Sequence, residues 1–253
     1  MTKLTALVVT FNEEKHLDEC LSALDFCQEK IVIDLGSTDN SVAIASRHNF
    51  RVITHPWTEI VEPLRSWAIA QASHDWIVFM DPDEIFPVAS RPEVVETIAA
   101  GLFGGLTLER VNYFIGRPIK HGRWFGHAGF PRVFNKNSVI LSDSVHDGLK
   151  RKKEYRYRKI SGVIKHYWVD SLNQFYEKHN RYLKHEGASR YNRGERFSRF
   201  GMYRGLTINF IRWYLLNHGF LDRKDGWQLI KLALWYEKNA WLSLKKYQED
   251  LIP

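Results

Sequence analysis

The first part of the chain alternates between short apolar runs and segments in which apolar residues recur at helical spacing. In the first helical segment, Leu17, Leu21 and Leu24 fall on one face, and residues 61–72 repeat the pattern. The apolar runs are rich in β-branched residues and have the length of buried strands; they cover residues 4–10, 30–34, 50–54 and 76–80. Strands that alternate with helices are typical of a doubly wound α/β sheet, which we predict here.

After the fourth strand the pattern predicts one more helix and then a region of short strands. Ser90 and Glu93 have the spacing of a capping box, so we expect a helix from there to about Leu102. Apolar pieces separated by Gly- and Asn-containing turns follow, which indicates a mixed β region; they cover residues 107–115, 130–134, 139–141 and 159–168.

From Ser171 almost to the end the spacing is helical. We therefore expect an α/β fold with a Rossmann-like, mostly parallel sheet, an appended mixed β region and C-terminal helices. The expected division is an α/β domain over residues 1–150 and a mainly helical extension over residues 151–253.

The length and composition fit a chain with a full core, because 44% of its 253 residues are hydrophobic. No stretch resembles a signal peptide, and no apolar run approaches the roughly 20 residues of a membrane-spanning helix. Cys20 and Cys27 are expected to be small core residues on a helix, since a disulfide framework or metal cluster needs more partners. Unpaired cysteines favour a reducing compartment, so we expect a cytoplasmic protein.

The net charge of +7 conceals an asymmetry along the chain. Residues 1–147 carry 13 Lys and Arg against 19 Asp and Glu, whereas residues 148–253 carry 23 against 10. Of the 35 aromatic residues, 20 lie beyond Gly148. Basic helices with Trp and Tyr are typical of proteins that lie on an anionic membrane surface, which we expect here. Two alternatives fit the same composition: rings that only pack the helices, and a nucleic-acid-binding tail.

Carboxylates follow the predicted strands at the edge where a parallel sheet binds its ligands. Asp34 ends the second strand, and Asp81 and Asp83 follow the fourth. Two carboxylates one residue apart can face one Mg²⁺ or Mn²⁺ that bridges phosphates, although a plain polar turn has the same pattern. Neither of the glycine-rich phosphate motifs, G-x-G-x-x-G and G-x-x-x-x-G-K-[ST], occurs. A nucleotide at this edge therefore depends on carboxylates, a metal and a basic residue.

Four motifs together resemble the inverting family 2 glycosyltransferases. They occur in the order and spacing of that family, at residues 9–14, 33–41, 64–67 and 81–84. The segment 145–147, Val-His-Asp, and the basic, aromatic tail are most similar to the bacterial subgroup that adds sugars to the lipopolysaccharide inner core. The resemblance implies an A-type nucleotide-sugar-binding and catalytic domain over residues 1–150. It also implies direct displacement with inversion of the anomeric carbon.

The resemblance further implies roles for individual residues. Asp83 holds the Mg²⁺ or Mn²⁺ ion, with Asp81 on the metal or the ribose. Asp147 is the first candidate for the catalytic base and His146 the second. The donor-binding residues are Thr10, Phe11, Glu13, Asp34, Arg65 and Asp81. The implied partners are a nucleoside-diphosphate sugar, with a UDP-sugar favoured, and a lipid-linked glycan on the inner face of the plasma membrane, and no nucleic acid.

Three positions depart from the usual family pattern. Leu35 stands where a second acidic residue or Ser is frequent, Pro82 replaces a small residue and stiffens the acidic turn, and Asp147 is one methylene shorter than the usual Glu.

The mixed β region contains further candidates for binding acceptor phosphates or sugars: His121, Arg123, Trp124 and Arg132.

A metal-dependent phosphotransferase or phosphatase with Asp81 as nucleophile is the remaining alternative. That mechanism calls for a Thr two residues after Asp83, where this chain has Ile85. It also calls for Lys and Ser or Thr motifs at later strand ends.

Overall fold

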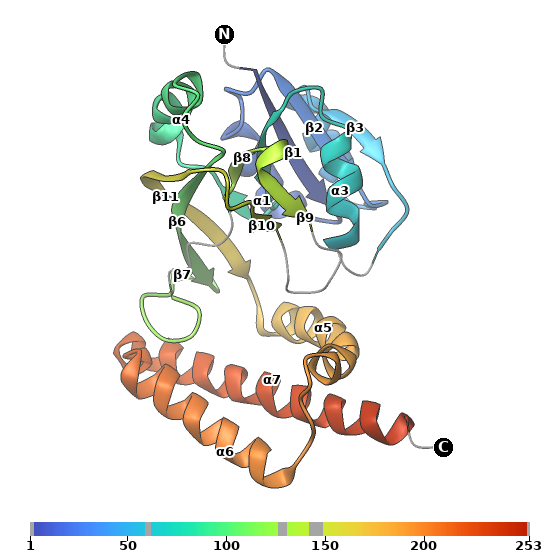
Figure 1. Cartoon of the computed structure of the whole chain (residues 1–253), viewed down its shortest axis with the longest axis vertical. Helices are drawn as coiled ribbons and strands as arrows, with labels where there is room; N and C mark the ends of the chain where they lie inside the picture. The colour runs from blue at the N-terminus through green and yellow to red at the C-terminus, as the bar shows by residue number, and fades with distance from the viewer. Residues whose placement is uncertain (1–2, 59–61, 126–130, 142–148, 252–253) are drawn as a thin grey trace. The chain divides into compact units, whose positions relative to one another are not determined.

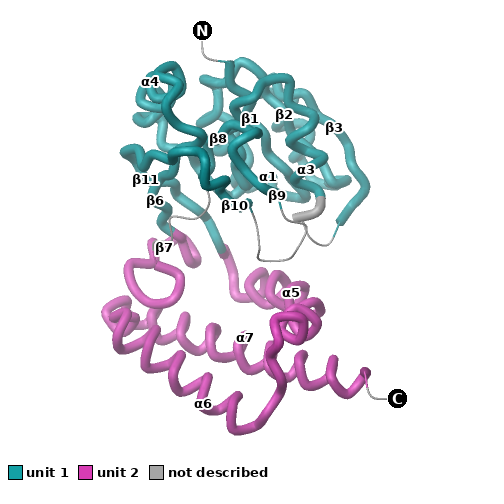
Figure 2. The backbone as a smooth tube through the Cα atoms, viewed as in Figure 1, with its two compact units in different colours: residues 1–111, 127–168 teal, residues 112–126, 169–253 magenta. Residues whose placement is uncertain are grey.

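The computed structural model describes residues 3–58, 62–125, 131–141 and 149–251. The chain forms two compact units (Figure 2). Unit 1 comprises residues 1–111 and 127–168, and unit 2 comprises residues 112–126 and 169–253. The sheet, which carries the predicted strand ends, belongs to unit 1 apart from short stretches of β6, β7 and β11 that run into unit 2.

The four predicted strands are present and form the parallel half of the sheet (Figure 1). Their order is β3-β2-β1-β4, with β1 at Leu4–Thr10, β2 at Glu29–Asp34, β3 at Arg51–Thr54 and β4 at Trp76–Met80. Three helices connect them: α1 at Glu14–Ser22, α2 at Ser41–Arg47 and α3 at Glu62–Ala70. In this register Thr10 pairs with Asp34, so the carboxyl ends of β1 and β2 lie side by side.

The mixed β region continues the same sheet beyond β4 in the order β8-β6-β11-β5. These strands are β8 (Val133–Asn135), β6 (Gly105–Phe114), β11 (Tyr157–Val169) and β5 (Glu84–Ile85). Strand β7 (Arg117–Pro118) pairs with β6, while β9 (Val139–Leu141) and β10 (Leu149–Arg151) form a separate pair. Strand β8 is antiparallel to β4, and β5 is antiparallel to β11. The short β5 therefore anchors the turn that follows β4.

Two local expectations were wrong. Helix α4 (Arg91–Ala99) ends before Leu102, and the capping box does not form. Instead, the Ser90 hydroxyl donates to the Ser161 carbonyl (2.6 Å), and the Glu93 carboxylate accepts from the Ser161 backbone and hydroxyl. Ser90 and Glu93 thus connect the start of α4 to β11. Ser90 is the last residue of the 3₁₀ turn η1 (Val88–Ser90), which precedes α4.

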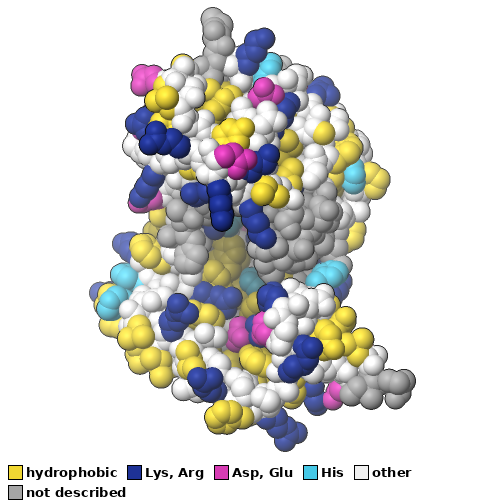
Figure 3. All heavy atoms as spheres, viewed as in Figure 1, with side chains coloured by type: hydrophobic (Ala, Val, Ile, Leu, Met, Phe, Trp, Pro, Cys, Tyr) yellow, Lys and Arg dark blue, Asp and Glu magenta, His cyan; other side chains and the backbone are white. Residues whose placement is uncertain are grey.

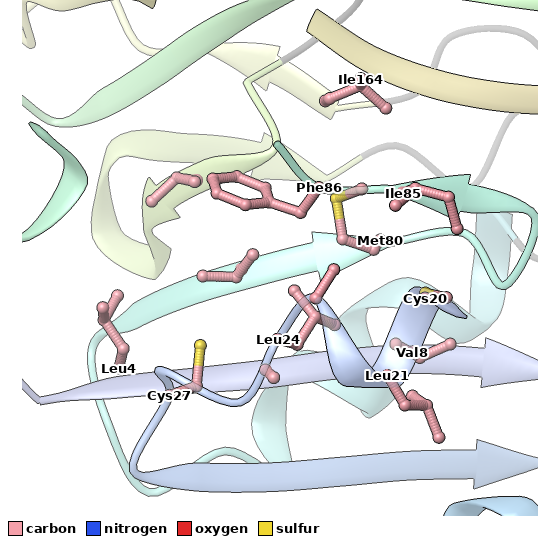
Figure 4. Close-up of a cluster of buried hydrophobic side chains, with 14 of the residues drawn as sticks. Leu4, Val8, Cys20, Leu21, Leu24, Cys27, Met80, Ile85, Phe86 and Ile164 are labelled. Atoms are coloured by element: carbon pink, nitrogen blue, oxygen red, sulfur yellow. The ribbon is translucent and has the colours of Figure 1, made fainter. Parts of the chain in front are cut away.

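Helices cover both faces of the parallel strands. Alternate residues of β1 face opposite sides: Val8 packs with residues of α1, α2 and α4, whereas Leu7 packs with residues of α3. Helix α1 ends at Ser22, so Leu24 and Cys27 follow the helix but are still buried in the first cluster (Figure 4).

Cys20 and Cys27 are both buried and free, which confirms the expectation of core residues. Burial raises the pKa of the Cys27 thiol to about 12 and also raises that of Cys20, so both thiols stay protonated and unreactive near neutral pH.

Unit 2 is mainly helical. It contains α5 (Leu172–Asn192), α6 (Arg199–Phe210), the π-helical segment η3 (Ile211–Leu216), the 3₁₀ turn η4 (Gly219–Asp222) and α7 (Arg223–Asp250). Helices α5 and α7 approach closely at Gly187. A Cβ atom at this position would lie only 2.5 Å from the Ser243 carbonyl oxygen. Within the part of the chain that the structure describes, no helix is both long and apolar enough to span a bilayer.

The boundary between the units differs from the division that we expected at residue 150. Strand β11 begins at Tyr157, and its residues up to Trp168 belong to unit 1 because they complete the sheet next to β5. Conversely, residues 112–126, which begin with the last part of β6, belong to unit 2.

Candidate active site

The acidic turn after β4 is a tight loop between two strands. The Glu84 amide donates to the Asp81 carbonyl (3.0 Å), and the Asp83 carbonyl accepts from the Tyr167 amide (2.8 Å) on β11. Glu84 pairs with His166 across β5 and β11. The sheet itself therefore fixes the backbone from which the carboxylates of this turn project.

Arg132 is the central cation of the turn. Its backbone carbonyl accepts from Phe79 of β4 (2.9 Å), which places the side chain beside the end of that strand. Its guanidinium donates to Asp81 Oδ2 (2.6 Å) and to Glu84 Oε1, and Arg110 from β6 also donates to Glu84 Oε1 (3.1 Å). The side chains of Arg132 and Glu84 are buried, at 6% and 0% exposure. Glu84, the last residue of the acidic motif at residues 81–84, is thus an internal ion-pair partner.

This pairing fixes the charge of Asp81. Burial raises the pKa of Asp81, but the charge and hydrogen bond of Arg132 outweigh that effect, and the net pKa lies below its ordinary value. His166 and Arg65 lower the pKa of Asp81 further through their charges. Asp81 is therefore a carboxylate at neutral pH, and one of its oxygens is already engaged by Arg132.

Asp83 faces His166 rather than Arg132. His166 Nε2 lies 3.4 Å from Asp83 Oδ2, and the two side chains are only 10% and 13% exposed. A carboxylate oxygen beside an imidazole nitrogen is a donor set that suits Mn²⁺, and a lone carboxylate with waters suits Mg²⁺. Among the described residues, no cluster of three or more His, Cys, Asp or Glu side chains is arranged to hold a metal. Asp83 and His166 are therefore suitable ligands for a divalent ion, but they are only part of a ligand set.

Arg65 reaches the same region from α3. Arg65 lies near the start of α3, the helix that follows the carboxyl end of β3, and its charge is among the causes that lower the pKa of Asp81. Arg65, Asp81 and Asp83 thus lie toward one end of the sheet, and their roles there stay predictions.

An open aromatic groove lies at the carboxyl ends of β1, β2 and β3. It is lined by Phe11, Leu35, Gly36, Thr54, His55, Pro56 and Trp57. The rings of Phe11 and Trp57 meet edge to face, with centroids 6.4 Å apart, and both side chains are exposed. Such a groove offers flat apolar surface for a planar ring, and Leu35, the departure from the family pattern, contributes to its floor.

The loops beside this groove are held together by Asn12. Asn12 adopts a left-handed backbone conformation (φ 55°), and its side-chain oxygen accepts from the Thr38 amide (2.7 Å) after β2. The Glu13 amide donates to the Ser41 hydroxyl (3.0 Å) at the start of α2. The loops after β1 and β2 therefore form one rigid edge.

Two predicted donor-binding residues are almost fully buried in this edge. The carboxylate of Asp34 accepts from the amides of Gly36 (3.1 Å) and Ser37 (3.2 Å), so part of its capacity stabilises its own turn. The Thr10 hydroxyl is buried and, among the described residues, has no hydrogen-bond partner. Burial of a polar group without a partner is costly, which makes the Thr10 hydroxyl a candidate contact for a ligand.

Asp147 and His146, the predicted base candidates, lie outside the described residues. Three of the four acceptor candidates belong to unit 2 and make internal contacts there. His121 Nδ1 lies 2.9 Å from the Asp222 carboxylate, and the Arg123 guanidinium lies 4.3 Å from the centre of the Trp213 ring. Burial lowers the pKa of Arg123 from its ordinary value.

His166 and Arg110 escaped prediction, and Arg132 was expected at the acceptor rather than in the acidic turn. No local spacing marks these residues, because each one reaches the turn through pairing between distant strands. The signal present in the sequence was weaker: Arg132 is a cation within the predicted piece 130–134, and His166 lies within the predicted strand 159–168.

The fold and this edge define an α/β protein of the class that binds nucleotides with carboxylates and cations instead of a glycine-rich loop. The chain belongs to glycosyl transferase family 2, whose family model matches residues 5–198. This match confirms the predicted family, the A-type fold and the assignment as a glycosyltransferase that uses nucleotide sugars. It does not favour the nucleic-acid-binding or phosphotransferase alternatives.

Relatives along nearly the whole chain carry the same assignment. The lipopolysaccharide core biosynthesis glycosyltransferase LpsC of Rhizobium meliloti is 24% identical over 253 residues, which cover 94% of this chain and 93% of that protein. An uncharacterized glycosyltransferase of Rickettsia typhi is 24% identical over 237 residues, covering 89% of this chain and 81% of that protein.

Two solved glycosyltransferase structures overlap part of the chain. Residues 1–349 of S. aureus TarS, in complex with UDP-GlcNAc, are 22% identical with a TM-score of 0.40, over 44% of this chain and 35% of that one. Glucosyl-3-phosphoglycerate synthase from Mycobacterium tuberculosis, in complex with Mn²⁺ and UDP-glucose, is 22% identical with a TM-score of 0.36, over 44% of each chain.

Proposed function

We propose that unit 1 binds a nucleoside-diphosphate sugar, with a UDP-sugar as the favoured donor, along the carboxyl ends of β1, β2 and β4. In this proposal the base lies in the groove beside Phe11 and Trp57. Thr10, Glu13 and Asp34 provide polar contacts for the base and ribose, and Arg65 provides a cation for the diphosphate. Family membership and the ionised acidic turn next to the aromatic groove support this arrangement.

We further propose that a Mg²⁺ or Mn²⁺ ion binds at Asp83 with His166 beside it. The observation that carries this assignment is the 3.4 Å approach of His166 Nε2 to Asp83 Oδ2 directly after β4. A bound cation stabilises the negative charge that develops on the leaving diphosphate. Arg132 keeps Asp81 ionised and oriented, so that its free oxygen can contact the ribose or the metal ion.

Transfer itself is proposed to occur by direct displacement with inversion onto a glycan hydroxyl. Asp147 is proposed as the base that accepts the proton of this hydroxyl, with His146 as the second choice, on the strength of their motif in the sequence. The relative LpsC is named for lipopolysaccharide core biosynthesis, which supports a lipid-linked glycan of the cell surface as acceptor. With such an acceptor, we propose that the protein acts on the cytoplasmic face of the plasma membrane.

Thermal unfolding of the full chain with UDP, with and without Mn²⁺, tests the proposal. Ligand at about 100 times its Kd contributes about 2.7 kcal/mol, so we expect the Tm to rise by several degrees only when both are present. Asp83→Asn should abolish the metal-dependent part of this shift. Asp75→Asn, which removes an exposed carboxylate at the opposite end of β4, is the control and should keep it. A UDP shift that is equal with and without metal in the wild type and in Asp83→Asn contradicts the metal assignment.

A further inference from the structure

Helix α6 and the π-helical segment η3 expose a continuous apolar stripe. Phe200 is 80% exposed and Leu216 is 67% exposed. The stripe contains the exposed residues Phe200, Tyr203, Ile208, Ile211, Leu215 and Leu216. At about 100° per residue, all of them except Leu216, which ends the π-helical segment, fall within an arc of about 140° on one side of the helix. A surface helix in a globular protein normally turns its apolar side toward the core, so this arrangement is reversed.

The opposite side of α6 is the one that packs within unit 2. Met202 is buried and lies about 200° around the helix from Phe200, at about 100° per residue. Cβ atoms on Gly201 and Gly205 would lie 3.6 Å from the Trp241 ring of α7, so these small residues let the two helices approach. The stripe residues stay exposed although α6 approaches α7 closely at these glycines.

The charge along the same segment has one sign. Residues 196–221 contain four Arg and no Asp or Glu. Arg199, Arg204 and Arg212 are exposed and lie within or beside the stripe. In Figure 3, hydrophobic and basic side chains are interspersed over the surface of unit 2 where Figure 1 draws α6.

We propose that α6 and η3 form an in-plane membrane-binding helix that inserts its apolar stripe into the interface of an anionic bilayer. Exposed apolar side chains flanked by arginines match acyl chains below anionic headgroups. Pairing of this surface with a second copy of the chain is disfavoured, because a two-fold interface brings the same arginines together. The inference locates the membrane contact of the proposed function on defined residues, and it does not depend on the donor site.

Co-sedimentation of the full chain with vesicles tests this surface. We expect binding to vesicles of phosphatidylglycerol and phosphatidylcholine, and much weaker binding to phosphatidylcholine alone. The double variant Phe200→Ser/Leu216→Ser should lower the partition coefficient by at least about tenfold, since it removes two large apolar side chains from the bilayer. The control Leu102→Ser, at a position in unit 1 with 63% exposure, should bind like the wild type.

A second arm separates charge from apolar insertion. Arg204→Gln/Arg212→Gln should lower partitioning to the anionic vesicles by about fivefold per residue and leave binding to neutral vesicles unchanged. Sedimentation velocity without lipid tests whether a second copy of the chain covers this surface instead. A wild-type dimer that the double variant Phe200→Ser/Leu216→Ser dissociates would overturn the proposal. Unchanged partitioning of Phe200→Ser/Leu216→Ser also overturns it.

The donor site provides an independent readout for the same variants. Phe200→Ser/Leu216→Ser should keep the wild-type Tm and the wild-type Tm shift with UDP and Mn²⁺, because both substituted side chains are exposed and lie in unit 2. Loss of vesicle binding in this variant with an intact Tm shift by UDP therefore supports the membrane surface and says nothing against the donor site. Absence of a UDP shift in the wild type and in every variant contradicts the donor site and leaves the membrane surface untouched.

Discussion

The guanidinium of Arg132 lies 2.6 Å from the carboxylate of Asp81, although 51 residues separate them in the chain. The same guanidinium also binds the fully buried Glu84. Arg132 therefore connects the end of β4 with the start of β8 and holds two carboxylates at the edge where the donor is proposed to bind. Its charge stabilises the ionised form of Asp81. Burial lowers the pKa of Arg132, but the charges of Asp81 and Glu84 outweigh that effect and raise it.

Arg132→Met should destabilise the protein by about 3 kcal/mol or more, because among the described residues it leaves the buried Glu84 with Arg110 as its one cationic partner. Urea unfolding at neutral pH measures the loss. Lys159→Met, which removes an exposed pair with Glu109 on the same sheet, is the control and should cost much less. Equal losses in the two variants would contradict a buried ionic anchor.

His166→Asn should raise the Mn²⁺ concentration for half-maximal sugar transfer by about 10- to 100-fold, the range typical of groups that support a metal ligand. Turnover of a UDP-sugar measured across a Mn²⁺ titration gives this value. His48→Asn is a matched control, because His48 also lies beside a carboxylate. Its partner is the exposed Asp18, at 3.0 Å, which does not belong to the acidic turn. An unchanged Mn²⁺ requirement in His166→Asn would remove His166 from the proposed metal site.

Trp57→Ala should weaken UDP binding by about tenfold, because stacking of one base on an aromatic ring contributes about 1–3 kcal/mol. Isothermal titration with UDP in the presence of Mn²⁺ measures the change. Trp227→Ala substitutes a similarly exposed Trp of unit 2 (49% against 52%) and should bind UDP as the wild type does. If both variants bind UDP equally well, the base does not lie in the groove of Phe11 and Trp57.

The stability of unit 2 should fall in mild acid because of His179. Burial is the main cause that lowers the pKa of His179, its hydrogen bond with Phe175 opposes the shift, and the charges of Lys178 and Arg123 add to the lowering, so that the net pKa is about 4. The unfolded chain has a His pKa of about 6.5, so between these values the unfolded chain binds the additional proton. The free energy of unfolding should therefore decrease as the pH falls from about 6.5 to 4, by up to about 3 kcal/mol.

Urea unfolding at pH 7.5 and pH 5 checks this decrease. His179→Phe keeps a ring stacked on Phe175, whose centroid lies 3.8 Å away, and should reduce the difference between the two pH values. His185→Phe, on the same helix but partly exposed, is the control and should retain the difference. A full pH dependence in His179→Phe would assign the effect to other groups.

The sequence by itself predicted the four parallel strands, the helices between them and the family. A short apolar run predicts each strand, and the polar residues that follow it indicate the edge of the sheet. Asp81 and Asp83 could be placed at that edge because the carboxyl ends of parallel strands meet there. These placements needed only local spacing and the rules of α/β topology, whereas the family and the donor-binding role of Arg65 were predicted from the resemblance of the chain's motifs to that family.

Long-range pairing decided the rest. Ser90 and Glu93 have the spacing of a local cap, yet both bind Ser161, because strand β11 lies within reach of their side chains. The spacing of apolar residues in α6 marked a helix but not the side that faces solvent, which its packing against Trp241 determines. His166 and Arg132 reach the acidic turn only through the pairing of β5 with β11 and of β4 with β8. Spacing along the chain encodes the elements, whereas the neighbours of a charged side chain depend on which distant strands share a sheet.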